Sequence, residues 1–236
     1  MGTSPMVATE MYQYLKDEVS DVILIYTDNE YVKAGTFAVK ASLESKYHAH
    51  VHLQKLDFAD INSDKDMVNF IKAVAESVKT QKDTYGVDKI IINASGGRKL
   101  EIIVLSIYAS IFLFDKVYNI INKDVQSYNE EYEKIKSIIL KFNGNNYKEL
   151  YVEYKDIIEP VFYPDMNNLF FFDVPIVKFP RDEINNIKKA LTSKSIEDSD
   201  LPDYKLKAYR DSGFITFDRT TIYRTELGDI ILNYIQ

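Results

Sequence analysis

The chain has 236 residues, of which 46% are hydrophobic, and a formal net charge of −7. This length suits one large domain, or one ordinary domain with a small one. The negative charge excludes a global basic field that gathers nucleic acid, so a polyanion must be bound in a local pocket. The sequence contains no cysteine, which excludes disulfides, thiolate metal sites and cysteine nucleophiles. No apolar run approaches the roughly 20 residues of a membrane span, and no signal peptide opens the sequence. We therefore expect a cytoplasmic protein without a membrane partner.

Apolar runs and helical patterns alternate through the first half of the chain. A first helix is expected at 6–16, and later helices at 34–45, 65–79 and 99–114. Three apolar runs and one weaker segment predict strands, at 22–27, 89–94, 117–121 and 51–56. This alternation is typical of an α/β fold of Rossmann-like type, with a doubly wound, mainly parallel sheet.

The periodicity is weaker from 126 to 173. A charged helix is expected near 128–142. The aromatic-rich stretch that follows, up to Phe172, is expected to contain one or two strands.

Two prolines, Pro175 and Pro180, mark a domain boundary. We expect a Rossmann-like ligand-binding domain at 1–175 and a small domain at 180–236. Asp182 is expected to cap the first helix of the small domain, and Thr225 the last. A helix near 204–210 and a hairpin at 214–223 lie between them. Helices followed by a hairpin are typical of a winged helix-turn-helix domain.

A loop of small residues, Gly2-Thr3-Ser4-Pro5, precedes the first expected helix. Such a loop exposes backbone N–H groups and the positive end of the helix dipole, which together attract anions. Ser4 can donate a hydrogen bond to a phosphate or orient a sugar hydroxyl. The alternative is an ordinary Ser-Pro start of a helix.

A second loop, Ser95-Gly96-Gly97-Arg98-Lys99, follows the buried strand at 89–94. Its glycines allow a ligand to approach the backbone, and its two cations lie beside the start of a helix. It matches neither GxxxxGK nor GxGxxG. The alternative is a tight turn with solvated basic residues. Because the carboxyl ends of parallel strands meet at one edge of a sheet, we expect the two loops to converge on one ligand.

Together these motifs resemble those of CRISPR-associated Rossmann-fold (CARF) proteins. GTSPxVxTE at 2–10 is similar to the signature of that family, and SGGRK at 95–99 to its second ligand-binding motif. YRTELG at 223–228 is similar to the winged helix that many members append. The resemblance covers most of the chain apart from 126–173. Family members carry an apolar strand before GTSP, so either such a strand lies upstream of Met1 or the sheet lacks a central strand.

The resemblance implies a homodimer that takes part in type III CRISPR antiviral defence. It binds a cyclic oligoadenylate, commonly cyclic tetra-adenylate, across its two-fold axis, with no cofactor. Some members only sense this ligand. Others, the ring nucleases, cut it without a metal into linear products that end in a 2′,3′-cyclic phosphate. By this similarity we expect a ring nuclease in which Lys99 and Ser4 are catalytic. The expected ligand-binding residues are Gly2, Thr3, Ser4, Ser95, Gly96, Gly97, Arg98 and Lys99.

Two other functions stay open. One is a ligand-responsive transcription regulator whose winged helix binds DNA, and the other is a Rossmann-like domain that binds a different nucleotide. Residues 180–236 contain nine Lys and Arg and ten Asp and Glu, a net charge of −1. This charge disfavours DNA as a partner, because DNA-binding modules present a basic face. The helix at 99–114 is apolar on nearly every side, so we expect one face to meet the sheet and the other a second copy of the chain or the small domain. A homodimer held largely through this helix is the prediction.

Three histidines alternate in the sequence, at His48, His50 and His52. On a strand they share one face, as metal ligands do, but no carboxylate stands at a matching spacing. We therefore expect an exposed strand face and no metal. None of the three follows an arginine in the R-x4-6-H pattern of HEPN ribonucleases, which disfavours a fused ribonuclease.

Overall fold

The computed structural model describes residues 1–112 and 114–235 of this mixed α/β protein. Leu113, within the expected helix 99–114, and Gln236, at the end of the expected small domain, lie outside the described residues. The chain divides into two compact units. The first consists of Met1–Asn62, Ile91–Ile102 and Lys116–Val174, and the second of Ser63–Ile90, Ile103–Asp115 and Pro175–Gln236. The domain division at 175–180 stays a prediction.

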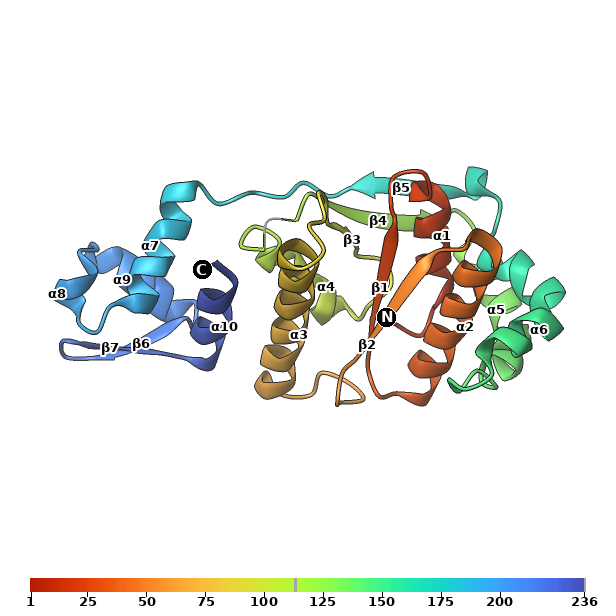
Figure 1. The fold of residues 1–236 in the computed structure, drawn as a ribbon, viewed down its shortest axis with the longest axis horizontal. Helices are drawn as coiled ribbons and strands as arrows, with labels where there is room; N and C mark the ends of the chain where they lie inside the picture. Colours follow the sequence, from red (N-terminus) through yellow and green to blue (C-terminus); the bar gives the residue numbers. More distant parts are fainter. Residues whose placement is uncertain (113, 236) are drawn as a thin grey trace. The chain divides into compact units, whose positions relative to one another are not determined.

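The strands of the first unit form two small sheets, where the sequence predicted one (Figure 1). β1 (Asp21–Tyr26) pairs in parallel with β2 (His50–Lys55). β3 (Ile91–Asn93) pairs in parallel with β4 (Lys116–Asn122), and β4 pairs in antiparallel fashion with β5 (Leu169–Asp173). The predicted strands and their parallel pairing are therefore present, but within the described residues no ladder joins β1 to β3.

Helices of the first unit enclose a core built from small, aliphatic and aromatic side chains. The helices are α1 (Met6–Leu15), α2 (Glu30–Tyr47), α5 (Val125–Ile139) and α6 (Tyr147–Phe162). α2 packs against α1, α5 and α6. Several side chains at these contacts are almost fully buried, namely Ala38, Val39, Leu43, Ile139, Ile158 and Phe162. A short 3-10 helix, Met166–Asn168, leads into β5.

The middle of the chain contains one of the one or two expected strands, β5, and in addition helix α6, which the sequence analysis did not predict. The aromatic residues of this stretch recur at intervals of three and four, which is the helical period. Tyr151, Ile158 and Phe162 lie on the buried side of the helix. Pro160 lies in the last turn of the helix, where it cannot donate a hydrogen bond to the carbonyl four residues earlier. Aromatic composition alone did not reveal this helix, since aromatic residues favour strands on average.

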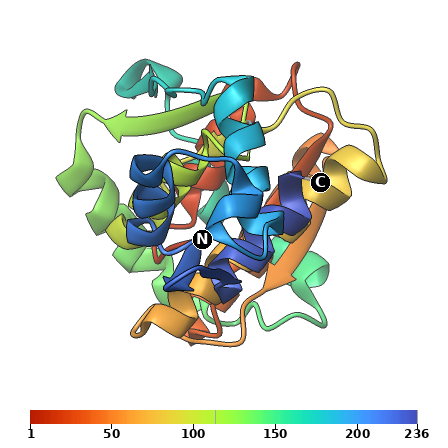
Figure 2. The same ribbon diagram turned by 90° about the vertical axis from the view of Figure 1, so that its left-hand side faces the viewer.

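The second unit combines α3 (Asp64–Asp83) with the C-terminal elements, which face the viewer in Figure 2. These are α7 (Arg181–Thr192), α8 (Ile196–Ser199), α9 (Asp203–Asp211), β6 (Ile215–Asp218), β7 (Thr221–Arg224) and α10 (Glu226–Ile235). Thr225 caps α10 as expected, because its Oγ1 accepts a hydrogen bond from the Gly228 N–H at 3.0 Å. Asp182 instead lies inside the first turn of α7, which follows Pro180 without a side-chain cap.

Helix α4 (Lys99–Tyr108) is shorter than the expected helix 99–114. After Tyr108 the described chain turns, and the Phe112 and Phe114 side chains are almost fully buried. The Phe112 ring lies 4.7 Å from the Tyr234 ring of α10, centroid to centroid. The helix thus ends early because the Phe112 and Phe114 side chains are buried in the second unit. The described helices include none that is both long and apolar enough to cross a membrane.

A buried carboxylate lies on α1, one helical turn beyond the opening loop. Glu10 is 1% exposed, and its Oε1 accepts a hydrogen bond from the Tyr128 hydroxyl at 2.6 Å. Burial raises the pKa of Glu10, and the Tyr128 hydrogen bond offsets only part of this effect. The raised pKa means that folding favours the neutral acid, so ionised Glu10 destabilises the fold.

We predict that Glu10→Gln stabilises the protein relative to wild type in a pH-dependent manner. Below the ordinary glutamate pKa of about 4.3 both chains carry a neutral side chain, and the difference is small. As pH rises through the raised pKa of Glu10, wild type loses stability that the glutamine variant keeps. Urea unfolding between pH 4 and pH 8 measures this difference. Glu18→Gln, at an exposed position, is the matched control, and a Glu10→Gln effect that does not change with pH contradicts the prediction.

Candidate functional site

Two loops of the first unit meet near the carboxyl ends of β1 and β3. A Cβ atom on Gly2 would lie 2.7 Å from the Gly96 carbonyl oxygen, and one on Gly96 would lie 2.9 Å from Cγ2 of Val7. Only glycine permits so close an approach. The structure thus brings together the two motifs that the sequence analysis selected. We call residues Gly2–Ser4 and Ser95–Lys99 the loop site.

Side-chain hydrogen bonds hold the two loops together. The Asn93 amide donates to the Val7 carbonyl of α1 at 2.8 Å, and its oxygen accepts from the Ser95 N–H at 2.9 Å. The Ser95 hydroxyl accepts from the Ile120 N–H and donates to Asn119 Oδ1 at 3.4 Å, which attaches the loop to β4. The Met1 nitrogen donates to the Ile25 carbonyl in β1. Both loops are therefore anchored to strands.

The start of α4 is capped by its own carboxylate. Glu101 is 5% exposed and accepts the Arg98 N–H at 3.0 Å, which is one half of a capping box. A Cβ atom on Gly97 would lie 2.6 Å from the same carboxylate, so a side chain at this position would collide with Glu101. The next N–H groups of the helix have no acceptor within the helix and are available to an anion.

The two cations of the loop site have different surroundings. Arg98 forms an ion pair with Asp60, which lies in the loop after β2, with 2.5 Å between Nη1 and Oδ2. Lys99 is exposed, and no ion pair within the described parts of the chain involves it. Ser4 is partly buried at the entry to α1, and Thr3 is exposed. Lys99 is thus the cation that is free to meet a phosphate.

Sequence reasoning missed three polar groups of the site. Glu101 was detectable, because a glutamate three residues after Arg98 has the spacing of a capping box. Asp60 and Asn119 carry no such signal. Asp60 reaches the loop site from the loop after β2 and Asn119 from the middle of β4, through contacts that linear spacing does not report.

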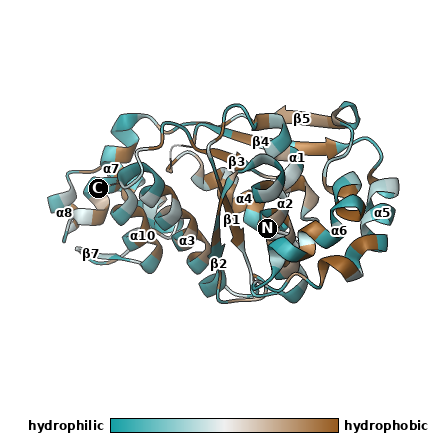
Figure 3. Ribbon diagram, turned by 45° about the vertical axis from the view of Figure 1, so that its right-hand side comes forward, coloured by the Kyte–Doolittle hydropathy of each residue, from teal (hydrophilic) through white to brown (hydrophobic). Residues whose placement is uncertain are grey.

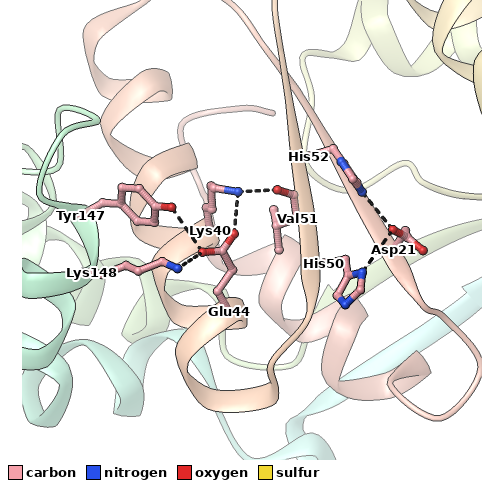
Figure 4. Close-up of polar contacts among 8 residues, drawn as sticks. All are labelled: Asp21, Lys40, Glu44, His50, Val51, His52, Tyr147 and Lys148. Carbon is pink, nitrogen blue, oxygen red and sulfur yellow. Dashed lines mark hydrogen bonds and ion pairs between the residues drawn. The ribbon is translucent and has the colours of Figure 1, made fainter.

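The alternating histidines do not form one group. His48 ends α2 in a left-handed conformation, with φ of 56°, and only His50 and His52 lie on β2 (Figure 4). His50 and His52 are exposed, as expected of a solvent-facing strand face, and the neighbouring strand brings a carboxylate beside them. Asp21 Oδ1 lies 2.9 Å from His52 Nε2 and 3.9 Å from His50 Nδ1. The His52 hydrogen bond lowers the pKa of Asp21. Among the described residues, no group of three His, Cys, Asp or Glu has a geometry that holds a metal.

A second polar network in Figure 4 ties α2 to its neighbours. Glu44 accepts from Lys40 at 2.6 Å and from Lys148 of α6 at 3.1 Å, and Lys40 also donates to the Val51 carbonyl of β2. Burial alone raises the pKa of Glu44, but the two lysines outweigh it and the pKa is lowered. This network joins α2, α6 and β2. Lys40, Lys148 and Glu44 are paired with one another, so we do not assign a ligand site to them.

Comparison with known proteins identifies a family. Residues 4–199 match the sequence model of the family described as CRISPR-associated protein NE0113 (Cas_NE0113). The match covers most of the chain, which therefore belongs to this family of CRISPR-associated proteins. No curated protein matches the sequence. The predicted association with CRISPR is confirmed, and the roles of the loop-site residues stay predictions.

We predict that Asn93→Asp destabilises the loop site. Aspartate keeps the acceptor for the Ser95 N–H but turns an oxygen toward the Val7 carbonyl, so the repulsion of two acceptors replaces a hydrogen bond. Loss of one hydrogen bond lowers the free energy of unfolding by about 0.5–1.5 kcal/mol, and we expect a loss of at least this size, measured in urea. Asn29→Asp is the matched control: Asn29 caps α2 through its side-chain oxygen, and aspartate caps equally well. Equal effects of the two substitutions would contradict the role of Asn93.

Proposed function

We propose that this protein binds a cyclic oligoadenylate, cyclic tetra-adenylate, at the loop site and cleaves it as a metal-independent ring nuclease. The observation that carries the proposal is the contact of the two loops at Gly2 and Gly96. The motifs that resemble those of CARF proteins lie together, in a chain that belongs to a CRISPR-associated family. A ligand in contact with both motifs is therefore sterically reasonable.

Lys99 suits a phosphodiester substrate because, among the described residues, no carboxylate pairs with its ammonium and competes with the ligand. In the pentavalent transition state the charge on the phosphoryl oxygens grows, and a nearby cation stabilises that state more than the ground state. Arg98 is already paired with Asp60, so it contributes a cation whose charge is partly offset. We therefore assign the main electrostatic role to Lys99.

Ser4 is assigned to positioning. In the proposed step the ribose 2′-oxygen attacks the adjacent phosphorus, the bond from phosphorus to the 5′-oxygen breaks, and the 2′-OH proton is lost while the leaving oxygen gains one. The products are a 2′,3′-cyclic phosphate and a 5′-hydroxyl, so the step balances without water or metal. Holding the 2′-OH in line with the leaving oxygen is a matter of geometry, which a hydroxyl beside the ligand can provide.

We also propose that the first unit is a CARF domain of Rossmann-like type and that the C-terminal elements form a winged helix. The parallel pairs β1–β2 and β3–β4 support the first assignment. For the second, three helices are followed by an antiparallel hairpin, β6–β7, and a last helix. The hairpin turns at Arg219, whose φ is 47°. This order of elements is the one expected of a winged helix.

We propose a homodimer because α4 carries exposed apolar side chains. Ile103 and Ile107 lie one turn apart on this helix and are 55% and 61% exposed, and Leu100 is 42% exposed. An apolar stripe of this kind is unfavourable in water and is typical of an interface. A second copy that packs its own α4 against the stripe would bury it, and a two-fold dimer would present the loop site twice to one ring.

The alternative of a DNA-binding regulator receives less support. The cations of α9 are already neutralised by carboxylates of the same unit. Lys205 pairs with Glu183, Lys207 with Asp203 at 2.7 Å, and Arg210 with Asp211 at 2.8 Å. Phosphate contacts would require breaking these pairs, and few counterions would be released from DNA to drive binding.

We predict that Lys99→Ala lowers the rate of cyclic tetra-adenylate cleavage by roughly 10²-fold and also weakens binding, because it removes a cation from a phosphate whose charge grows. Ser4→Ala should affect the rate more than the affinity. Separation of products on a denaturing gel, in EDTA, measures cleavage, and the expected products of the dimer are two identical dinucleotides. Wild-type turnover should not change on chelation.

The control for Lys99→Ala is Lys155→Ala, which removes an exposed lysine of α6 at a distance in sequence from both motifs. It should bind and cleave as wild type does. Wild-type protein that binds the ring and leaves it intact for hours would contradict the enzyme proposal and assign the loop site to a sensor. Wild-type protein that does not bind the ring would contradict the whole proposal.

The dimer proposal predicts that Ile107→Glu gives a monomer at micromolar concentration in light scattering. A buried carboxylate on each copy would be unpaired at the two-fold interface, which is strongly unfavourable. Val152→Glu, at a 68% exposed position on α6, should leave the dimer intact. A wild-type monomer, or a dimeric Ile107→Glu variant, would show that α4 is not the interface.

A further inference from the structure

Three apolar side chains form an exposed face on the sheet of β3, β4 and β5. Phe170 and Phe172 of β5 are each 49% exposed, and Ile121 of β4 is 46% exposed. In the antiparallel register Phe170 is opposite Ile121, and Phe172 is opposite Asn119, so all four side chains lie on the same side of the sheet. We call Ile121, Phe170 and Phe172 the aromatic face. Figure 3 shows β5 as a largely hydrophobic segment.

The other side of the same strands is covered. Tyr118, Ile120 and Leu169 form a buried cluster with Met11 and Leu15 of α1. On one side of β5 the hydrophobic side chains are buried in the core. On the other side Phe170 and Phe172 are half-exposed, and packing within the chain does not account for them. Half-exposed phenylalanines on an edge strand favour aggregation unless a partner or a ligand covers them.

The aromatic face is directly connected to the loop site. Asn119, which is opposite Phe172, accepts the hydrogen bond of the Ser95 hydroxyl. Side chains opposite each other in an antiparallel pair have Cβ atoms roughly 5 Å apart. Phe172 is thus linked through a single residue, Asn119, to the loop that we assign to a phosphate. This separation is within the span of a single nucleotide.

A cation accompanies the rings. Lys123 Nζ lies 4.7 Å from the centroid of the Phe170 ring, and the rings of Phe170 and Phe172 are 6.2 Å apart. Aromatic rings next to cations, beside a phosphate-binding loop, are the arrangement with which proteins bind unpaired nucleobases. Three half-exposed side chains present far less than the roughly 800 Å² that each partner buries in a stable protein interface. The size and composition of the face therefore favour a nucleobase over a protein.

We propose that the aromatic face stacks adenine bases of the nucleotide ligand whose phosphates the loop site holds. This inference rests on the proposed function and adds to it a base-binding site. Stacking accepts any base in principle, so Phe170 and Phe172 contribute affinity and orientation, and the preference for adenine over pyrimidines follows from its larger ring area.

The absence of tryptophan from the sequence permits a direct test. Phe172→Trp introduces a single tryptophan, whose fluorescence should be quenched, saturably and within seconds of mixing, by cyclic tetra-adenylate. Inorganic phosphate, which has no base, should not quench it. Phe172→Ala should weaken binding of the ring by roughly 10-fold, and Phe172→Trp, which keeps an aromatic ring, should weaken it less than Phe172→Ala does. Tyr204→Ala, which removes a 69% exposed aromatic side chain of α9, is the matched control and should bind normally.

The outcomes separate this inference from the proposed function. The base-binding site would be overturned, and the proposed function left intact, by two results together. Phe172→Ala would bind the ring as well as wild type does, and the ring would not quench the fluorescence of the Phe172→Trp variant. Conversion of the wild-type dimer to a monomer by Phe172→Ala would overturn it also, and would assign the face to contacts between copies. No binding of the ring by wild type would overturn the proposed function, and the base-binding site with it.

Discussion

The close approach of two backbones at Gly2 and Gly96 is the constraint on which the candidate site depends. A Cβ atom on Gly2 would overlap the Gly96 carbonyl, so the loops meet only because neither position carries a side chain. Asn93 then fixes the contact, since its amide bonds to α1 on one side and to the second loop on the other. Without this contact the helix starts of α1 and α4 would not serve one ligand.

The electrostatics of the site follow from a chain that is acidic as a whole. With a net charge of −7, the protein attracts an anion only where a cation is left without a carboxylate. At the loop site Glu101 accepts a backbone N–H and Asp60 pairs with Arg98, which leaves Lys99. In the C-terminal elements the cations of α9 are paired. This difference is why we assign the nucleotide chemistry to the loop site and do not assign DNA binding to α9.

The loop site and the aromatic face together explain why polar and apolar groups alternate around one end of β3 and β4. Ser95 belongs to the loop and contacts Asn119 on β4, and Asn119 is opposite Phe172 on β5. A phosphate, a sugar and a base follow one another in a nucleotide in the same order as a cationic loop, a polar pair and an aromatic ring do here. The order of the chemical groups in the proposed ligand thus matches the order of the groups on the protein, and the charges match as well.

The sequence by itself determined those features that have local causes. The apolar run of β1, the period of α1, the Thr225 cap of α10 and the hairpin β6–β7 were predictable because each depends on neighbouring residues. The two glycine loops were predictable as candidate anion sites for the same reason. Only the tertiary structure decided that α4 ends at Tyr108, since the burial of Phe112 depends on α10. It also decided that Asp60 pairs with Arg98 and that Glu10 is buried against Tyr128, because these contacts join residues far apart in the chain. No periodicity or spacing in the sequence reports such contacts, since they arise only when the strands and helices pack.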